Sequence, residues 1–437
     1  MVELQNVVIV DGVRSAFTRG GRGALVGNRL DDAGAQVLRA LMDRNPKVSP
    51  WLIADIGLGQ VGRAPEMGGI GSDNVAKLAG LPAEVCSFET NRQCGSSMET
   101  LHRIAQSIMV GNIEAGVALG VERMGRALGG GDRPPPNRVT KFNDRRAKLQ
   151  PGIQRDLPPD WSEHFSRPIP DFILDSPAVL TMLQTGQNVA EMYELTREDL
   201  DQFAVASQHK YGEALAKGVY KDEIIPLELE APVFDDEGNW LPDEHGEMKV
   251  LEVDEGYRAG TNIEALSQLK TIPGIKSYGD REIVITAGNA CPTNDGISAA
   301  LLMSEAKALE LGLEPLARIV GFGIAGVKPQ VMGLGPIPAS NKALRQAGLT
   351  ADQIDRVEFN EAFAAQVIPS ITELGLAMDR VNVNGGSLAI GHPLGATGAR
   401  LVSTVSHELR RSGTRYGLAT QCIGVGMGIA TVVESLN

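Results

Sequence analysis

The chain has 437 residues, of which 43% are hydrophobic and 22% carry a charge, and its formal net charge is −13. A chain of this length can bury a large core and is expected to divide into two or three domains. The negative charge argues against a nucleic-acid partner, because phosphate binding depends on clustered Lys and Arg side chains.

The cysteine content argues against disulfides and against a zinc site. The four cysteines show no CxxC spacing, so we expect free thiols in a reducing compartment and no bound metal; they are Cys86, Cys94, Cys291 and Cys422. The N-terminal sequence lacks a basic segment followed by an apolar one, and no run reaches the roughly 18 apolar residues of a membrane span. We therefore expect no membrane span and a cytoplasmic location.

Taken in chain order, the elements predicted near the two ends of the chain resemble each other. A buried strand, an amphipathic helix and a second strand are predicted at 7–11, 31–44 and 53–61, and the same order returns at 317–323, 340–349 and 354–362. Ile53 and Ile354 are separated by 301 positions (354 − 53), as are Gly116 and Gly417 (417 − 116). The shared offset suggests a duplication, and chance similarity between two α/β halves is the alternative.

Composition changes between the two halves. The middle contains Pro-rich and Asp-rich turns, one clear helix pattern opened by Thr196, and an acidic segment at 234–249 that we expect to be an exposed excursion. The sequence thus predicts an N-terminal half at 1–128, an inserted covering domain at 129–270 and a C-terminal half at 271–437. Helices alternating with apolar strands predict an α/β fold with parallel or mixed sheets.

Cys94, in NRQCGSS, follows an alternating apolar run and precedes a helical pattern with Leu101, Ile104 and Ile108 on one face. The cysteine is therefore expected at a strand-to-helix turn. There the unpaired N–H groups and the helix dipole would lower a thiol pKa from about 8.5 toward neutrality. The alternative is an inert, buried cysteine, which is the more common situation.

His392 differs from the other five histidines, which are expected in helices or polar loops. It lies between Gly391 and Pro393 in a glycine-rich segment, where a neutral imidazole could accept a proton from a thiol. The alternative is a structural histidine in a Gly-Pro turn.

Cys422 and Asn360 each follow a predicted apolar strand. Cys422 opens the run CIGVGMG, whose backbone N–H groups could form an oxyanion site while the thiol acts as acid or base. Asn360, in NEAFA, could position a water molecule, and the alternative is a helix N-cap.

Four motifs together resemble the thiolase family over essentially the whole chain: NRQCGSS, NEAFA, NVNGGSLAIGHPLGATGAR and CIGVGMG, in this order. The resemblance implies a duplicated five-layer α/β/α/β/α core with an inserted loop domain. It also implies coenzyme A thioesters as substrates, coenzyme A as a substrate rather than a cofactor, and no metal. A homodimer or homotetramer is expected, and a hydratase/dehydrogenase partner is compatible with the family.

Residue by residue, the resemblance makes Cys94 the nucleophile and Cys422 the second acid or base. His392 would activate Cys94 and, with a water held by Asn360, would stabilise an enolate oxygen. The amides of Cys94 and Gly424 would form a second oxyanion hole. Two sets of donors suit the chemistry, because charge develops first on the attacked carbonyl and then on the leaving enolate.

Substrate contacts follow less directly from the resemblance. They are expected at Arg258 for the adenine and phosphate end, at Ala287 and Cys291 for pantetheine, and at Met182 and Phe363 near the thioester. The sequence departs from the family pattern at Cys291, where a serine is usual, and at Thr181, where acetoacetyl-specific members tend to carry histidine. Val425 also interrupts the usual triple glycine after Cys422.

The leading hypothesis is therefore reversible thiolytic cleavage of a 3-oxoacyl-CoA to acetyl-CoA and a shortened acyl-CoA through a Cys acyl-enzyme, in a degradative role. One alternative is an acetoacetyl-CoA-forming biosynthetic thiolase. A decarboxylating ketosynthase is a second alternative, although no second histidine motif replaces Cys422. A CoA-thioester-binding scaffold with little turnover is the third.

Overall fold

In the computed structural model, the described residues are 4–125, 165–177 and 180–436. Nine strands form the path of one large sheet in the order β10-β11-β12-β9-β1-β8-β5-β3-β4, and β2 (Thr18–Arg19) pairs with β8 beside it. The path is made of β1 (Val7–Arg14), β3 (Ile53–Gly59), β4 (Cys86–Thr90), β5 (Ala115–Arg123), β8 (Asn294–Ser304), β9 (Ala317–Gly326), β10 (Arg356–Phe359), β11 (Tyr416–Ile423) and β12 (Met427–Glu434). It joins two smaller units through one short antiparallel contact of β1 with β9.

The two units repeat one topology, which confirms the duplication expected from the sequence. The parallel pairing of β3 with β5 sets Asp55 opposite Gly116, and that of β10 with β11 sets Arg356 opposite Gly417. The residue numbers of the second pair exceed those of the first by 301 (356 − 55 and 417 − 116), which is the offset found in the sequence. In each unit an antiparallel neighbour follows, β8 beside β5 and β12 beside β11, and then β1 or β9.

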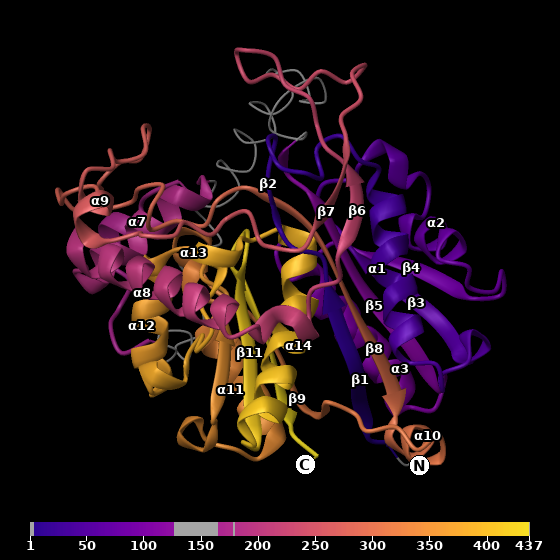
Figure 1. Ribbon diagram of the computed structural model, residues 1–437. Coiled ribbons are helices and arrows are strands. Elements are labelled where there is room, and N and C mark those ends of the chain that lie inside the picture. The colour runs from indigo at the N-terminus through magenta and orange to yellow at the C-terminus, as the bar shows by residue number, and fades with distance from the viewer. Residues whose placement is uncertain (1–3, 126–164, 178–179, 437) are drawn as a thin grey trace.

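Helices lie outside and between the two sheet units, giving five layers (Figure 1). Helices α3 (Ser96–Met109) and α14 (Leu394–Ser412) form the middle layer, α1 (Leu30–Arg44) and α2 (Gly71–Leu78) cover the N-terminal unit, and α11 (Pro336–Ala347) and α12 (Ala364–Leu374) cover the C-terminal unit. Strand β1 shows why: Val8 and Val10 pack in the α1 cluster, whereas Val7 and Ile9 pack in the α3–α14 cluster. Alternating side chains of a strand point to opposite faces, so a strand that is apolar throughout is buried on both.

The remaining elements lie mostly in or near the expected insertion. They are α6 (Asp171–Leu174), α7 (Met182–Tyr193), α8 (Arg197–Ala216), β6 (Leu227–Glu230), β7 (Met248–Leu251), α9 (Ile263–Ser267), α10 (Glu305–Glu310) and α13 (Ser387–Ile390). Helix α8 starts where the sequence indicates, because Thr196 and Asp199 form a reciprocal capping box. The segment between the paired strands β6 and β7 projects from the core (Figure 1).

Strand pairing does not divide the chain at residue 271. Strand β8 lies beyond that position, yet it pairs with β1 and β5 in the N-terminal unit. Residues 129–164 of the expected insertion fall outside the described residues. Within the part of the chain that the structure describes, no helix has the length and apolar character needed to span a membrane.

Candidate active site

Cys94 lies in a tight turn between β4 and α3, as the sequence predicts. Gln93 adopts a left-handed conformation (φ 46°), and its carbonyl accepts hydrogen bonds from the N–H and the hydroxyl of Ser96, the latter at 2.6 Å. Gly95 allows the turn to approach the opposite unit, because a Cβ there would lie 2.5 Å from the Ile423 side chain. The turn places the thiol just before the N-terminus of α3.

Two other thiols, Cys422 and Cys291, lie close to Cys94. The backbone N–H groups of Gly424 and of Cys94 itself interact with the Cys94 sulfur, and a negative charge on Cys94 would raise the pKa of both other thiols. The side-chain amide of Gln421 also donates to the Cys94 carbonyl. The structure thus brings together the two cysteines expected to be catalytic, the oxyanion glycine, and the cysteine expected near pantetheine.

The expectation of a lowered thiol pKa is wrong for this state of the protein. Burial raises the pKa of Cys94 to about 11, and the backbone hydrogen bond from Gly424 lowers it only in part. Burial likewise raises the pKa of Cys291 to about 12 and that of Cys422 well above its usual range. Desolvation of the charged form outweighs these backbone hydrogen bonds, so at neutral pH Cys94 needs a base.

His392 is buried and hydrogen-bonded through both ring nitrogens. Nδ1 lies 2.7 Å from the Thr397 hydroxyl, and Nε2 lies 3.3 Å from Nδ2 of Asn360. Because the Thr397 hydroxyl already donates to the Pro393 carbonyl (2.8 Å), it accepts from Nδ1–H. This assigns the lone pair to Nε2, where it can accept a proton.

The His392 imidazole is uncharged at neutral pH. Burial, aided by the positive charge of Arg400, lowers the pKa of His392 to about 3. Its backbone N–H donates to Oδ1 of Asn294 (3.0 Å), and Gly391 before it has φ 113°, a conformation that favours glycine. These contacts agree with an oriented base.

A buried polar chain orients Asn360. The Ser387 hydroxyl donates to Oδ1 of Asn360 (2.6 Å), Arg400 donates to Ser387 (3.0 Å), and Glu358 pairs with Arg400 (2.7 Å). Asn360 is not a helix N-cap, because α12 begins at Ala364. With Oδ1 occupied, its amide N–H groups face His392.

Cys94 and His392 come from different units, but the helices that follow them touch near their N-terminal ends. The Ala399 N–H of α14 donates to the Ser97 hydroxyl of α3 (2.9 Å). A Cβ on Gly398 would lie 2.4 Å from the Met98 nitrogen. Asn360 and Cys422 also lie at one sheet end, since the Asn360 N–H donates to the carbonyl of Thr420 (3.0 Å).

Of the residues expected to contact substrate, some are buried beside the thiols and others are exposed. Phe363 is buried in one apolar cluster with Cys422, and the Cys291 N–H donates to the Ala362 carbonyl (3.0 Å) beside it. Ala287 is exposed on the loop that precedes Cys291, and Met182 is exposed at the start of α7.

Arg258 is exposed on a loop that reaches the segment before His392. Its backbone N–H donates to Gln208 (3.0 Å), and Gln208 donates to the Leu388 carbonyl (2.9 Å). Gly256 lies so close to this segment that a Cβ would be 2.6 Å from the Ala389 carbonyl oxygen. Arg258 is thus held near the site through its backbone.

Sequence reasoning missed the polar residues that hold the site together. Ser387, Thr397 and Arg400 lie inside the motif quoted around His392, and their polar character within a buried glycine-rich segment was a usable signal. Asn294 and Gln421 carried no such signal, because their partners are distant in sequence.

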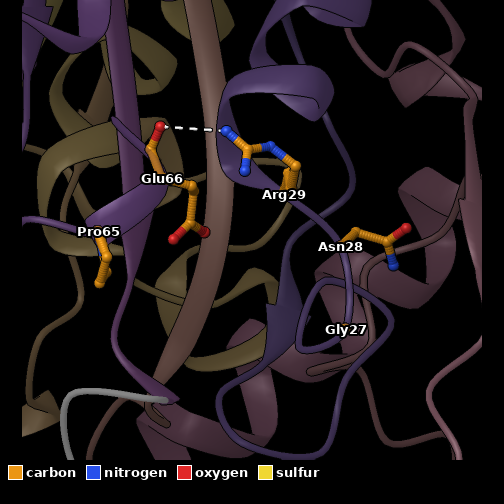
Figure 2. Close-up of a pocket in the computed structure, with 5 residues that line it drawn as sticks. All are labelled: Gly27, Asn28, Arg29, Pro65 and Glu66. Carbon is orange, nitrogen blue, oxygen red and sulfur yellow. Dashed lines mark hydrogen bonds between the residues drawn. The ribbon is translucent and has the colours of Figure 1, made fainter. Parts of the chain in front are cut away.

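Two surface cavities among the described residues lie away from the thiols. One, of about 400 Å³, is lined by Gly27, Asn28, Arg29, Pro65 and Glu66, and Arg29 donates across it to the Glu66 carbonyl at 3.4 Å (Figure 2). The other, of about 280 Å³, lies where Arg281 pairs with Glu194. No cluster of three His, Cys, Asp or Glu suited to a metal ion occurs within the described ranges.

Comparison with known proteins agrees with the fold and the motifs. The family model "Thiolase, N-terminal domain" matches residues 7–306, and "Thiolase, C-terminal domain" matches residues 313–435. The chain therefore belongs to the thiolase family.

Individual relatives match over nearly their whole length. A 3-ketoacyl-CoA thiolase of Vibrio vulnificus is 38% identical over 434 residues, covering 99% of this chain and 100% of the relative. A beta-ketoadipyl-CoA thiolase of Acinetobacter baylyi is 39% identical over 435 residues with the same coverage. The crystal structure of human mitochondrial 3-ketoacyl-CoA thiolase in complex with CoA superimposes with a TM-score of 0.79 at 30% identity, covering 100% of this chain and 99% of that one.

Proposed function

We propose that this member of the thiolase family is an acyl-CoA C-acyltransferase that cleaves a 3-oxoacyl-CoA to acetyl-CoA and a shortened acyl-CoA, reversibly. The observation that carries the proposal is that the Cys422 thiol and the Gly424 amide both interact with the Cys94 thiol. Relatives named as 3-ketoacyl-CoA and beta-ketoadipyl-CoA thiolases support it.

The first step is attack of the Cys94 sulfur on the 3-oxo carbon of the substrate. Nε2 of His392 takes the thiol proton, since that nitrogen carries the lone pair. The backbone N–H groups of Cys94 and Gly424 receive the negative charge on the attacked oxygen, because both already point at the sulfur.

The second step breaks the bond between Cα and Cβ. The enolate of acetyl-CoA leaves, and its oxygen is stabilised from the side of His392 and Asn360, the latter through a bound water. The thiol of Cys422 gives its proton to the enolate carbon, which is consistent with a pKa kept high by burial.

The third step transfers the acyl group from Cys94 to coenzyme A. The thiol of coenzyme A gives its proton to the Cys422 thiolate and attacks the acyl-enzyme. Cys94 leaves as a thiolate and recovers the proton that His392 had taken. The two half-reactions give ping-pong kinetics. Coenzyme A is here a substrate, in keeping with the human relative whose structure is titled as a CoA complex.

For coenzyme A binding, the proposed contacts are Arg258, Ala287, Cys291, Met182 and Phe363. Cys291 and Phe363 have the stronger support, because they lie with Cys422. A degradative direction is proposed from the 3-ketoacyl names of the relatives. The acetoacetyl-CoA-forming alternative differs in direction and chain length rather than in the residues used.

The proposal extends to assembly and location. A homo-oligomer is supported by β4, the strand at one edge of the large sheet, on which Cys86 is exposed. A cytoplasmic location is supported by four free thiols. A hydratase/dehydrogenase partner remains compatible with this proposal.

The test is an acyl adduct on Cys94. Incubation with acetoacetyl-CoA, followed by intact mass measurement, is expected to add one acetyl group to the parent and none to Cys94→Ala. The matched control Cys86→Ala removes an exposed thiol and is expected to keep the adduct. Tight binding without an adduct in the parent would favour the scaffold alternative, and release of carbon dioxide from a malonyl thioester would favour the ketosynthase.

A further inference from the structure

Glu122 is a buried carboxylate that none of the proposed steps uses. It lies near the end of β5, is 1% exposed, and accepts backbone hydrogen bonds from Val61 (3.0 Å), Gly62 (2.8 Å) and Gly395 (2.8 Å). Removing a carboxylate from water is costly, and three N–H donors offset that cost.

Through Gly395, the Glu122 carboxylate holds the start of α14. Gly395 follows His392 by three residues, and a Cβ there would lie 2.9 Å from Oε2 of Glu122, so glycine admits the carboxylate. On the other side of His392, its N–H is held by Asn294 of β8, the neighbour of β5. The adjacent strands β5 and β8 therefore each provide a side chain that accepts a hydrogen bond from the backbone of the segment 392–395.

The same carboxylate acts on the nucleophile. After burial, the negative charge of Glu122 is a further cause that raises the pKa of Cys94. Other ionisable groups face this pair: Asp295 of β8 acts on Glu122, and Cys291 and Cys422 interact with Cys94. Glu122 is thus in contact with the base segment and in electrostatic reach of the thiol.

We propose that Glu122 is a positioning residue of the thiolase reaction: through its hydrogen bond to the Gly395 N–H it fixes the start of α14, so that His392 is held where it meets Cys94. This inference rests on the proposed roles of Cys94 and His392.

Burial raises the pKa of Glu122 itself to about 7, while the three backbone N–H groups oppose the shift. As pH rises through this region, the carboxylate gains its charge, its hydrogen bonds strengthen, and the thiolate of Cys94 becomes less favourable. The inference therefore predicts an effect on both geometry and protonation, which two substitutions can separate.

The experiment measures alkylation of Cys94 by iodoacetamide against pH, read by mass analysis of the peptide that contains Cys94 in a Cys86→Ala background, together with kcat and KM for thiolysis. Glu122→Gln removes the charge at nearly constant shape, and Glu122→Asp keeps the charge but shortens the reach to Gly395. Glu314→Gln, on an exposed side chain, is the matched control for loss of one charge. Thermal melting of each variant checks that it folds.

We expect Glu122→Gln to lower the pH midpoint of alkylation, since a like charge is removed. Its kcat is expected to fall about 10- to 100-fold with little change in KM, because the base is misplaced. Glu122→Asp is expected to lower kcat while leaving the alkylation midpoint unchanged, and Glu314→Gln to resemble the parent.

An unchanged kcat in a folded Glu122→Gln variant would overturn the inference. A rise in KM as large as the fall in kcat would also overturn it, because a merely structural residue would disturb substrate binding as well. If Glu122→Gln does not fold, an unchanged kcat in Glu122→Asp overturns it instead. The acyl adduct of the parent is scored separately. Its absence would reject the roles proposed for Cys94, whereas the alkylation midpoint would still report on the electrostatic effect of Glu122 on the thiol.

Discussion

The two repeated units carry different residues at equivalent positions of one scaffold. With the offset of 301 positions, Gly59 at the end of β3 corresponds to Asn360 after β10 (360 − 59), and Gly120 in β5 to Gln421 in β11 (421 − 120). A Cβ on Gly59 would lie 2.3 Å from the Ser97 nitrogen, and one on Gly120 would lie 2.6 Å from the Ala396 Cα. The N-terminal unit uses these strand ends for close packing of helices.

The C-terminal unit uses the same strand ends for polar side chains. Asn360 faces His392, and Gln421 holds the Cys94 carbonyl. At the helix starts the arrangement is reversed. The N-terminal unit has the reactive residue, Cys94, where the C-terminal unit has Gly395 (395 − 94). The comparison teaches that, at equivalent positions of a duplicated fold, one unit can hold glycine for close packing while the other unit holds a polar or reactive side chain.

The largest effect is expected when the two helix starts are made alike. Cys94→Gly gives the N-terminal unit the residue of its counterpart, removes the nucleophile, and should lower kcat by about 10⁴-fold or more. Steady-state thiolysis of acetoacetyl-CoA measures the loss. Cys86→Gly, at the exposed edge strand, is the control, and turnover near the parent rate in Cys94→Gly would contradict the site.

Making the strand ends alike should have the next largest effect. Asn360→Gly copies Gly59, removes the amide beside His392, and should lower kcat by roughly 10²- to 10³-fold with a smaller change in KM, as for loss of one oxyanion donor. Asn112→Gly, in an exposed turn after α3, is the control. A large rise in KM with unchanged kcat would instead assign Asn360 to substrate binding.

The reverse exchange tests the packing side of the comparison. Gly59→Ala forces a Cβ onto the α3 backbone and should destabilise the fold by about 2 kcal/mol, as overpacking does. Chemical denaturation measures the change. Gly69→Ala, which has nothing within 4 Å of the added Cβ, should change stability far less. Equal stability of the two variants would show that the strand end has more room than its contacts imply.

A smaller effect, on the pH dependence of stability, is expected at His102, a buried histidine outside the proposed site. His102 of α3 lies 2.8 Å from the Thr431 hydroxyl, and burial lowers its pKa to about 3, as burial does for His392. Between pH 6.5 and 3 the unfolded chain binds a proton at this position that the native state does not, so stability falls as pH falls. His102→Gln should flatten this slope by up to about 1.4 kcal/mol per pH unit.

The measurement for His102→Gln is the free energy of unfolding from pH 7 to 5, compared with the parent so that other titrating groups cancel. Thiolysis at pH 7.5 should be unchanged, because His102 is remote from the thiols. A slope identical to that of the parent would mean that the native state admits the proton.

The sequence predicted the local parts of the site and not the long-range ones. The turn at Cys94 and the segment at His392 were accessible because neighbouring residues determine them. The place of β8 in the N-terminal unit was not accessible, since it depends on pairing with β1 and β5. The pKa of Cys94 was predicted in the wrong direction, because a helix start is visible in a sequence and the depth of burial is not.

Glu122 illustrates the same limit. In the sequence it is one acidic residue at the end of an apolar strand, and nothing nearby distinguishes it from a solvated side chain. Its three partners lie in two distant segments. Only the folded chain reveals that they converge.

The contact near the N-terminal ends of α3 and α14 restricts relative motion of the two repeats. Ser97 and Ala399 are hydrogen-bonded, and Gly398 leaves no room above Met98. This contact opposes hinge or shear motion between the two repeats, because such a motion would press the α14 backbone against the α3 backbone. Cys94 and His392, which precede these helices, are thereby held in a fixed spatial relation although they come from different repeats.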